Sequence, residues 1–549
     1  MERAPLRTVR RVLTGLILLL AQGGGAAEPP AAADRAGQSL YLDGLLLSGK
    51  PVRATVQQGV ALSGAAAACV QCHRRSGLGG SEGQNTIRPI AGRLLFSPAQ
   101  AEAVGRRPEP AGGVATRPGY TRATLARALR EGIDPAGRAL DALMPRYAVG
   151  DEEIAQLYAY LEGLSSASAP GVTDREIHFS TIVTPGVNPD KRRALLDVLQ
   201  AYFRDKNGGT RKEVRRREVG SEQMYRAFRT WVLHVWELGG APETWHAQLE
   251  AHYRQQPVFA VIGGLGHGSW QPVHGFCEEA GLPCVFPDVD YPVVEGAGYY
   301  SLYFSRGVTL EADVLARQLA ETRSGMGGIA QVFRDDALGR LPAQALREAM
   351  QRREAGALAD YPVSGGPVAA ESWARLLHDA RPATLVVWLD PSDVQGLAAT
   401  GAPPAGLQAV YLSASLSAVP PASLPAEWLD RVRMVYPFAL PANRARHLAR
   451  MHAWLRARNV PFADARTQAN AYFAATLTGD VMAHLGENFS RDYFIEGIEQ
   501  MTEVSLSPSI YPRLSLGPGQ RFASKGGYIV SFPGEAGGAP VPANGWLVP

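Results

Sequence analysis

The chain has 549 residues, of which 46% are hydrophobic and 19% charged, and its formal net charge is +3. This length exceeds one ordinary hydrophobic core and predicts two or three domains, while the composition is that of a globular protein rather than a disordered one. The nearly neutral charge gives no reason to expect nucleic acid as a partner.

The first 27 residues have the order of a secretory signal peptide. Four arginines between Arg3 and Arg11 precede an apolar run over 12–21, and small residues follow up to Ala27. This run is too short to span a bilayer, which needs about 20 residues, and no later stretch is apolar enough to do so. We expect cleavage near Ala27 and export, in a bacterium to the oxidising periplasm.

The stretch CVQCH places Cys69, Cys72 and His73 within five positions. C-x-x-C-H is the attachment signature of c-type haem, in which the two sulfurs bind the porphyrin and the histidine binds the iron. A zinc site would need two further ligands at matching spacing, and a redox dithiol would follow a buried strand. We interpret the motif as one covalently attached haem c, with the dithiol and the metal site as alternatives.

The sixth ligand of such an iron is predicted to be Met144. No histidine lies between His73 and His178, and Met144 is the one methionine between the initiator and Met224. It precedes a proline and then an amphipathic helix expected over 151–164. Ordinary core packing is the alternative role for this methionine. Ligation by histidine and methionine suits the transfer of single electrons.

Residues 35–165 resemble a class I cytochrome c domain, through CVQCH, IRPIAGRLL, LARALREGIDPAGRAL, MPRY and DEEIAQLYAYL. The resemblance implies a small all-α domain in which Pro89 offers its carbonyl to the second ring nitrogen of His73. It also implies a redox partner protein, or a periplasmic dehydrogenase or oxidase. A positive rim for an acidic partner is predicted at Arg74, Arg75, Arg88 and Arg93.

A second domain is predicted after a linker rich in Ser, Ala and Pro at residues 166–175. Apolar strands there alternate with helices of roughly 10–15 residues, which indicates βαβ units with parallel sheets in two lobes. One of these helices, over 189–209, is expected to stop at its terminal glycine pair.

Residues 176–535 resemble type I periplasmic substrate-binding proteins of the branched-chain amino acid transporter type. The resemblance rests on PVFAVIGGLGHGSWQPVHGFCEEAGLPCVFP, GYYSLYFSRGVTLEADVLARQL and QANAYFAATLTGDVMAHL. It implies a multidomain chain, with a two-lobed α/β domain and a cleft at the strand ends that holds a small molecule, such as an amino acid or a carboxylate. The candidate binding residues are Gly264, Gly266, His267, Ser269 and Trp270.

Two alternatives remain in this region. The glycine-rich loop can be a plain turn, with Ser269 capping the helix that follows. Cys277 and Cys284 lie at the two ends of a short turn and are expected to form a disulfide in an oxidising compartment, with two free buried thiols as the alternative.

The leading hypothesis is a periplasmic mono-haem c-type cytochrome that transfers electrons, with a clamshell domain for binding a small ligand or docking a partner. The alternative is a solute-binding protein or a haem-based sensor in which the haem regulates ligand binding. No acid/base constellation is recognisable in the sequence, so catalysis is not expected.

Overall fold

The fold is known from a computed structural model. It describes residues 32–56, 59–82, 85–98, 117–166, 168–217, 229–296, 298–322, 327–417, 424–503, 508–533 and 538–549. The predicted signal peptide, residues 1–27, lies outside these ranges. Within them, no helix is both long enough and apolar enough to cross a membrane.

The N-terminal domain is built on three helices, α1 (Ala32–Asp43), α4 (Arg122–Glu131) and α5 (Asp151–Gly163). Shorter elements complete it: β1 (Arg53–Thr55), β2 (Ala61–Ser63), η1 (Gly64–Ala67), α2 (Val70–His73), β3 (Gly80–Glu82), β4 (Asn85–Ile87), α3 (Gly92–Phe96) and β5 (Arg146–Tyr147). The prediction of an all-α domain is wrong in one respect, because β2-β1-β5 and β3-β4 form small antiparallel sheets. Strands of two or three residues are too short to show a periodic pattern.

Lobe 1 of the second domain contains a parallel five-stranded sheet with the order β10-β9-β8-β6-β7. Its elements are β6 (Glu176–Val183), α6 (Pro189–Arg217), β7 (Thr230–Glu237), η3 (Pro242–Thr244), α7 (Trp245–Gln255), β8 (Ala260–Ile262), α8 (Gln271–Glu279), β9 (Cys284–Val285) and β10 (Ser301–Leu302). Strands β6, β8, β9 and β10 are almost wholly buried, as expected for a parallel sheet that helices cover, whereas the edge strand β7 is mostly half-buried.

Lobe 2 contains a seven-stranded sheet with the order β12-β11-β13-β14-β15-β16-β17, parallel from β12 to β15 and antiparallel beyond. Its elements are α9 (Val308–Thr322), β11 (Ile329–Arg334), α10 (Ala337–Arg352), β12 (Leu358–Val363), α11 (Ala370–Ala380), β13 (Thr384–Trp388), α12 (Pro391–Ala398), β14 (Ala409–Ser413), α13 (Ala426–Leu429), β15 (Val432–Tyr436), β16 (Tyr528–Ser531) and β17 (Val541–Pro542). The predicted two-lobed α/β architecture with parallel sheets is confirmed.

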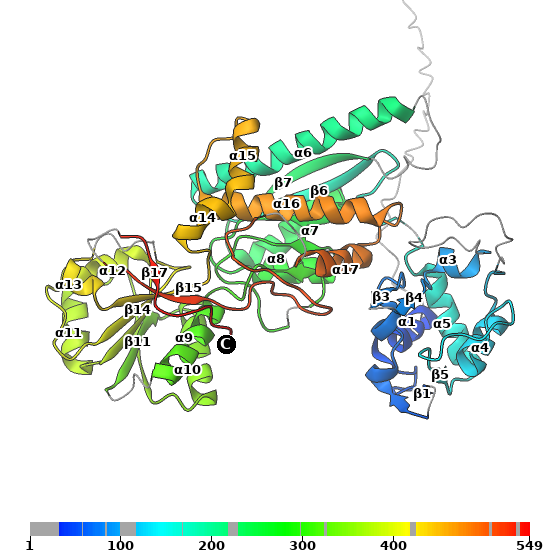
Figure 1. Cartoon of the computed structure of the whole chain (residues 1–549), viewed down its shortest axis with the longest axis horizontal. Coiled ribbons are helices and arrows are strands. Elements are labelled where there is room, and N and C mark those ends of the chain that lie inside the picture. Colours follow the sequence, from blue (N-terminus) through cyan, green and yellow to red (C-terminus); the bar gives the residue numbers. More distant parts are fainter. Residues whose placement is uncertain are drawn as a thin grey trace, which may run out of the picture.

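After β15 the chain returns to lobe 1 through four helices, α14 (Pro441–His447), α15 (Ala449–Ala457), α16 (Ala465–Leu485) and α17 (Arg491–Met501). Helix α16 packs along α6, and α17 lies on the side of lobe 1 that faces the N-terminal domain (Figure 1). One hydrophobic core includes Phe179 of lobe 1, Phe473 of α16 and Val410 of lobe 2. The returning helices are therefore part of the packing that joins the lobes.

Helix α6 does not end at Gly208 and Gly209, as the sequence predicted, but continues to Arg217. Glycine costs about 1 kcal/mol inside a helix, which tertiary contacts can offset. Just before the pair, the Asn207 side chain accepts from the backbone N–H of Trp231 and donates to its carbonyl, both at 2.8 Å. This two-sided bond fixes the helix to β7.

The predicted disulfide between Cys277 and Cys284 is absent, because both residues are buried free thiols in the core of lobe 1. Burial raises the pKa of the Cys277 thiol, and its hydrogen bond with Cys284 raises it further. The turn therefore brings the two sulfurs together as expected, but as a neutral hydrogen-bonded pair.

The N-terminal domain docks on α17 through the loop that follows the CVQCH motif. The buried Ser76 donates to the carboxylate of Glu496 from its backbone N–H at 2.8 Å and from its hydroxyl at 2.6 Å. Arg75 lies 3.6 Å from Asp492, and its guanidinium stands 4.5 Å from the ring centre of Tyr299. The two domains are thus joined by hydrogen bonds, an ion pair and a cation–π contact.

This interface changes the interpretation of the predicted positive rim. Besides Arg75, Arg93 points toward the second domain and donates to the side chain of Asn488 at 2.6 Å. Of the predicted rim, Arg88 and Arg93 are exposed to solvent, whereas Arg74 and Arg75 are half-buried. Part of the positive surface expected to attract an acidic partner therefore binds the chain's own second domain.

We predict that docking of the two domains weakens as pH rises from about 5 to 8. Burial raises the pKa of Glu496 from 4.5 to about 7, against the lowering effect of the Ser76 hydrogen bonds. Because the pKa of Glu496 is higher in the docked state than in the undocked state, the protonated carboxyl favours docking. This contribution to the free energy of docking, roughly 3 kcal/mol, is fully present below the undocked pKa and is lost as pH rises through the docked pKa. Hydrogen–deuterium exchange of peptides over 74–80, corrected for intrinsic rates, should show protection falling with pH.

Glu496→Gln keeps the size and one acceptor oxygen for the Ser76 N–H, and its amide NH2 can donate to the Ser76 hydroxyl, but it cannot ionise, so its protection should be independent of pH. Glu487→Gln, at an exposed position just before α17, is the matched control and should behave as the wild type. Equal pH dependence in the wild type and Glu496→Gln would contradict the assignment to Glu496.

Candidate functional site

The CVQCH residues lie on a single turn of helix at the centre of the N-terminal domain. The backbone N–H of His73 donates to the carbonyl of Cys69 at 2.9 Å, which closes the turn. Cys69 and His73 are buried, whereas Cys72 is exposed. Arg74, with φ of +60°, then reverses the chain direction. The two sulfurs and the imidazole are therefore held on one short, sharply terminated element.

The imidazole of His73 is oriented by a backbone carbonyl. Its Nδ1 lies 3.1 Å from the carbonyl oxygen of Arg88, to which it donates. The prediction that Pro89 supplies this carbonyl is wrong by one residue. Burial lowers the pKa of His73, so the ring is neutral. A neutral imidazole whose Nδ1–H is bonded presents Nε2 as the atom for a metal.

Met144 is partly buried in the hydrophobic cluster that also contains Cys69. It lies just before β5, and that strand is tied to the motif because the Tyr147 hydroxyl donates to the carbonyl of Ala67 at 2.9 Å. The structure thus brings Met144 and the CVQCH motif to the same hydrophobic core.

The surroundings of the motif lack the features expected of a zinc site or of a redox dithiol. No three His, Cys, Asp or Glu side chains converge as a metal site in the described part of the chain. The motif follows β2, which is largely exposed and not a buried strand. Burial raises the pKa of Cys69 to about 12, whereas redox-active thiols have lowered pKa values.

The glycine-rich loop predicted to bind a ligand joins β8 to α8. Gly264, with φ of +121°, and Gly266 leave room for the ring of Trp270, which a Cβ at Gly266 would approach to 2.7 Å. Trp270 is buried in the core of lobe 1 and therefore supports the loop instead of lining a cleft. The Ser269 hydroxyl accepts from the backbone N–H of Gln271 at 3.3 Å, but the N-cap of α8 is Trp270, so the capping role that the sequence left open for Ser269 is not confirmed.

His267 remains exposed at the tip of this loop. Its backbone N–H donates to the hydroxyl of Thr184, in the turn after β6, at 2.9 Å. A Cβ at the neighbouring Gly268 would lie 3.7 Å from the side chain of Leu338, in α10 of lobe 2. The loop tip therefore lies where the two lobes meet.

Sequence reasoning missed the charged residues at the strand ends of lobe 1. Arg466, at the start of α16, pairs with Asp288 and with Asp290, each at 2.8 Å. Thr467 and Asn470, on the same helix, donate to Asp288 at 3.1 and 3.2 Å. Asp288 is buried, so this network neutralises a carboxylate at the carboxyl end of a parallel strand.

Lobe 2 adds carboxyl groups to the same region. Asp336 follows β11, Asp390 follows β13, and Glu311 lies in the first turn of α9. All three, together with Asp290 of lobe 1, raise the pKa of Tyr291, whose burial is the larger cause of that shift. We call the surface formed by Asp288, Asp290, Tyr291, Glu311, Asp336, Asp390 and Arg466 the inter-lobe face.

One signal in the sequence could have identified part of this face. Asp288, Asp336 and Asp390 each come one to three residues after a buried parallel strand. The carboxyl ends of parallel strands gather at one edge of a sheet, where ligands bind in open α/β folds. Glu311 and Arg466 carry no such signal because they lie on helices.

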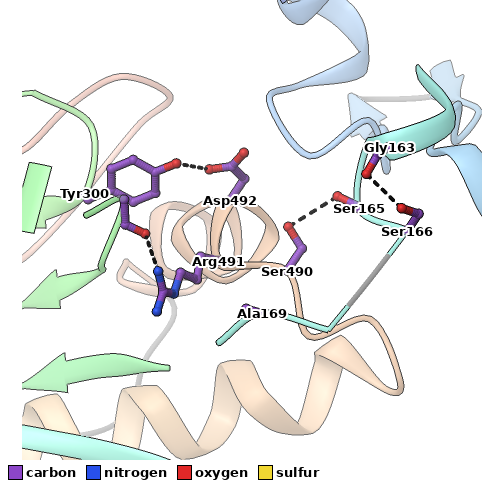
Figure 2. Close-up of a pocket in the computed structure, with 9 residues that line it drawn as sticks. Gly163, Ser165, Ser166, Ala169, Tyr300, Ser490, Arg491 and Asp492 are labelled. Carbon is purple, nitrogen blue, oxygen red and sulfur yellow. Dashed lines mark hydrogen bonds between the residues drawn. The ribbon is translucent and has the colours of Figure 1, made fainter. Parts of the chain in front are cut away.

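An opening of about 210 Å³ lies elsewhere, at the junction between the domains (Figure 2). Ser165 and Ser166 from the end of the N-terminal domain meet the start of α17 there. The Ser165 hydroxyl lies 3.2 Å from that of Ser490, and Tyr300 donates to Asp492 at 2.9 Å. The opening is small and polar, and it belongs to the docking interface described above.

Comparison with solved structures supports the fold. A branched-chain amino acid ABC transporter protein from Thermus thermophilus with bound valine is 12% identical, with a TM-score of 0.51, and the match covers 69% of this chain and 98% of that one. An ABC transporter substrate-binding protein from Aeropyrum pernix is 15% identical, with a TM-score of 0.51, over 68% of this chain and 96% of that one.

No curated protein matches the sequence. The family described as periplasmic binding protein matches residues 233–532, more than half of the chain. This match lies within the two-lobed domain and covers parts of both sheets. The chain therefore belongs to the periplasmic binding protein family.

Proposed function

We propose that the chain is an exported solute-binding protein of the periplasm and that it binds a small molecule at the inter-lobe face. The observation that carries this proposal is the buried network of Asp288, Asp290 and Arg466 where the strand ends of lobe 1 meet lobe 2. The Thermus thermophilus structure, which holds valine, supports a small-molecule ligand for this fold. Small ligands bind at strand ends between lobes because backbone and side-chain polar groups converge there.

Arg466→Gln should destabilise the second domain and remove ligand binding. The substitution leaves Asp288 buried without its cation, which costs about 3–5 kcal/mol. A thermal-shift screen of the full chain against small metabolites should find a class that raises the unfolding midpoint of the wild type, since a ligand at a hundred times its Kd adds about 2.7 kcal/mol. The same compounds should leave the midpoint of Arg466→Gln unchanged.

Arg458→Gln is the matched control, because Arg458 pairs with Asp205 at the surface. Loss of an exposed pair costs less than about 1 kcal/mol and should not affect ligand binding. If no class of compound stabilises the wild type, or if the two variants respond alike, the proposal of a solute site at this face is wrong.

The N-terminal domain is proposed to carry one covalently attached haem c. Cys69 and Cys72 would tether the ring, His73 would bind the iron, and Met144 would be its second axial ligand. The carbonyl of Arg88 holds the imidazole in one tautomer and orientation. A haem with these two axial ligands supplies one-electron transfer, which implies a redox partner in the periplasm. A regulatory role for the haem in ligand binding is the alternative.

Met144→Ala distinguishes ligation from core packing. The wild type, produced with c-type maturation, should carry the mass of one haem, and its reduced spectrum should not change with carbon monoxide. Met144→Ala should retain the haem and bind carbon monoxide, because an axial position is then open. Leu143→Ala, at a neighbouring side chain that is 61% exposed, is the control and should match the wild type.

A colourless protein with the mass of the bare polypeptide would overturn the proposal of a haem. A coloured Met144→Ala protein that remains indifferent to carbon monoxide would instead assign Met144 to core packing.

A further inference from the structure

A second opening lies at the hinge of the two-lobed domain, and the residues that line it are not those of the inter-lobe face. Residues 303–307 lead from β10 of lobe 1 to α9 of lobe 2, and residues 519–525 lead from α17 toward β16. The backbone N–H of Tyr303 donates to the carbonyl of Arg521 at 2.8 Å, and that of Ala523 donates to the carbonyl of Tyr303 at 3.1 Å. Two segments that connect the lobes therefore lie side by side.

This hinge opening is lined mainly by hydrogen-bond donors. Its volume is about 460 Å³, within the range of about 300–1,000 Å³ typical of small-molecule sites. None of the described side chains that line it is a carboxylate, and five can donate hydrogen bonds, namely those of Arg306, Gln520, Arg521, Ser524 and Lys525. A ligand with oxygen acceptors and negative charge is complementary to such a wall.

Lys525 is the cation of this wall that lacks a carboxylate partner among the described residues. Its side chain is exposed, and its ammonium group donates to Oε1 of Gln520 at 2.6 Å and to the hydroxyl of Ser515 at 3.3 Å. An ammonium group has three N–H donors, so the third is available to a ligand. Oε1 of Gln520 also accepts from the backbone N–H of Gly517 at 3.0 Å, which leaves the amide NH2 of Gln520 as a further donor.

Ser524 provides another donor, and its burial makes the lack of a partner costly. The residue is 2% exposed, and its hydroxyl has no hydrogen-bond partner in the described part of the chain. Its backbone N–H donates to the carbonyl of Phe304 at 2.6 Å, which holds Ser524 against the other hinge segment. Because Ser524 lines the opening, an acceptor atom of a ligand bound there would satisfy this hydroxyl.

The two arginines of the wall have carboxylate partners of their own. Arg306 pairs with Asp313 at 2.7 Å, and Arg521 is bonded to the buried carboxylate of Glu499. Pro549, the last residue of the sequence, also lines the opening, and its terminal carboxylate is a competitor within the chain for Lys525. No ion pair joins these two groups in the described structure. The charge of Lys525 is therefore left for one anionic group of a ligand.

An apolar surface accompanies these donors. The ring of Phe522 stacks on that of Tyr303, with ring centres 5.5 Å apart, and Val548 is 47% exposed. Both Phe522 and Val548 line the opening. A ligand with an apolar body and one acidic group would bury apolar surface here while its oxygen atoms accept from Lys525 and Ser524.

We propose that the hinge opening binds a small organic acid whose carboxylate or phosphate group accepts from Lys525 and Ser524 and whose apolar part contacts Phe522. This site goes beyond the solute site proposed at the inter-lobe face and does not depend on it. Arg306 belongs to one hinge segment and Lys525 to the other, so a bound acid contacts both. Its binding would therefore favour one relative orientation of the two lobes.

Isothermal titration calorimetry of the full chain tests this with four probes of similar size. They are benzoate and phenyl phosphate as the two kinds of anion, benzamide as a neutral analogue and benzylamine as a cation. One or both anions should bind at least tenfold more tightly than benzamide, and benzylamine should not bind. Lys525→Gln should weaken the anion by roughly tenfold or more, and Ser524→Ala by roughly fivefold.

Lys50→Gln, at an exposed lysine of the N-terminal domain, is the matched control and should leave anion affinity unchanged. Both test variants should fold, since Lys525 is exposed and Ser524→Ala removes a hydroxyl that has no partner among the described residues. Hydrogen–deuterium exchange locates the site independently of the variants. The bound anion should raise protection in peptides that cover 303–307 and in peptides that cover 519–525.

Three outcomes would overturn the proposal. Equal affinity for benzoate, phenyl phosphate and benzamide would remove the role of charge, and wild-type affinity in both test variants would place the anion elsewhere. Binding of either anion only after deletion of Val548 and Pro549 would show that the chain's own carboxylate occupies the opening. None of these results bears on the solute site at the inter-lobe face, which Arg466→Gln tests separately.

Discussion

The carboxyl group of Glu496, buried against Ser76, is the contact on which the arrangement of the two domains depends. It accepts two hydrogen bonds from a single residue, and that residue lies three positions after His73. Truncating either side chain in the docked state would leave polar groups of the other buried without a partner. The CVQCH motif is therefore fixed with respect to the binding domain by hydrogen bonds that are costly to separate, rather than by the linker alone.

The same pair of helices reaches both candidate sites. Helix α16 begins with Arg466 and Asn470 at the inter-lobe face, and α17, which packs against it, presents Glu496 to the N-terminal domain. Closure of the two lobes would act on Arg466, because this side chain also stands over Phe438 of lobe 2. The packing of two adjacent helices thus connects the proposed haem site with the proposed solute site, which suits the alternative in which one site regulates the other.

A feature could be predicted from the sequence when the residues that form it lie close together along the chain. Cys69, Cys72 and His73 are found by spacing alone because one helical turn determines their geometry. The prediction for the hydrogen-bond partner of His73 is wrong by one residue. A backbone carbonyl carries no side-chain signal, and which carbonyl reaches the ring depends on the conformation of a loop. Trp270 was assigned to a cleft although it is buried, because a tryptophan beside glycines is compatible with either place. Glu311 could not be found, as its burial arises from packing between segments far apart in sequence.

Docking also restricts where a redox partner can approach the proposed haem. Arg75 is committed to Asp492 and Tyr299, so the side of the motif loop that faces α17 is closed to other proteins. The exposed residues near the motif include Cys72 within it, Arg88 beside His73, and Leu143 beside Met144. An apolar side chain that is 61% exposed next to a proposed axial ligand is suited to a small transient contact, since such encounters need little buried area. Electron transfer and domain docking would therefore use different residues of the N-terminal domain, and a partner could bind without separating Ser76 from Glu496.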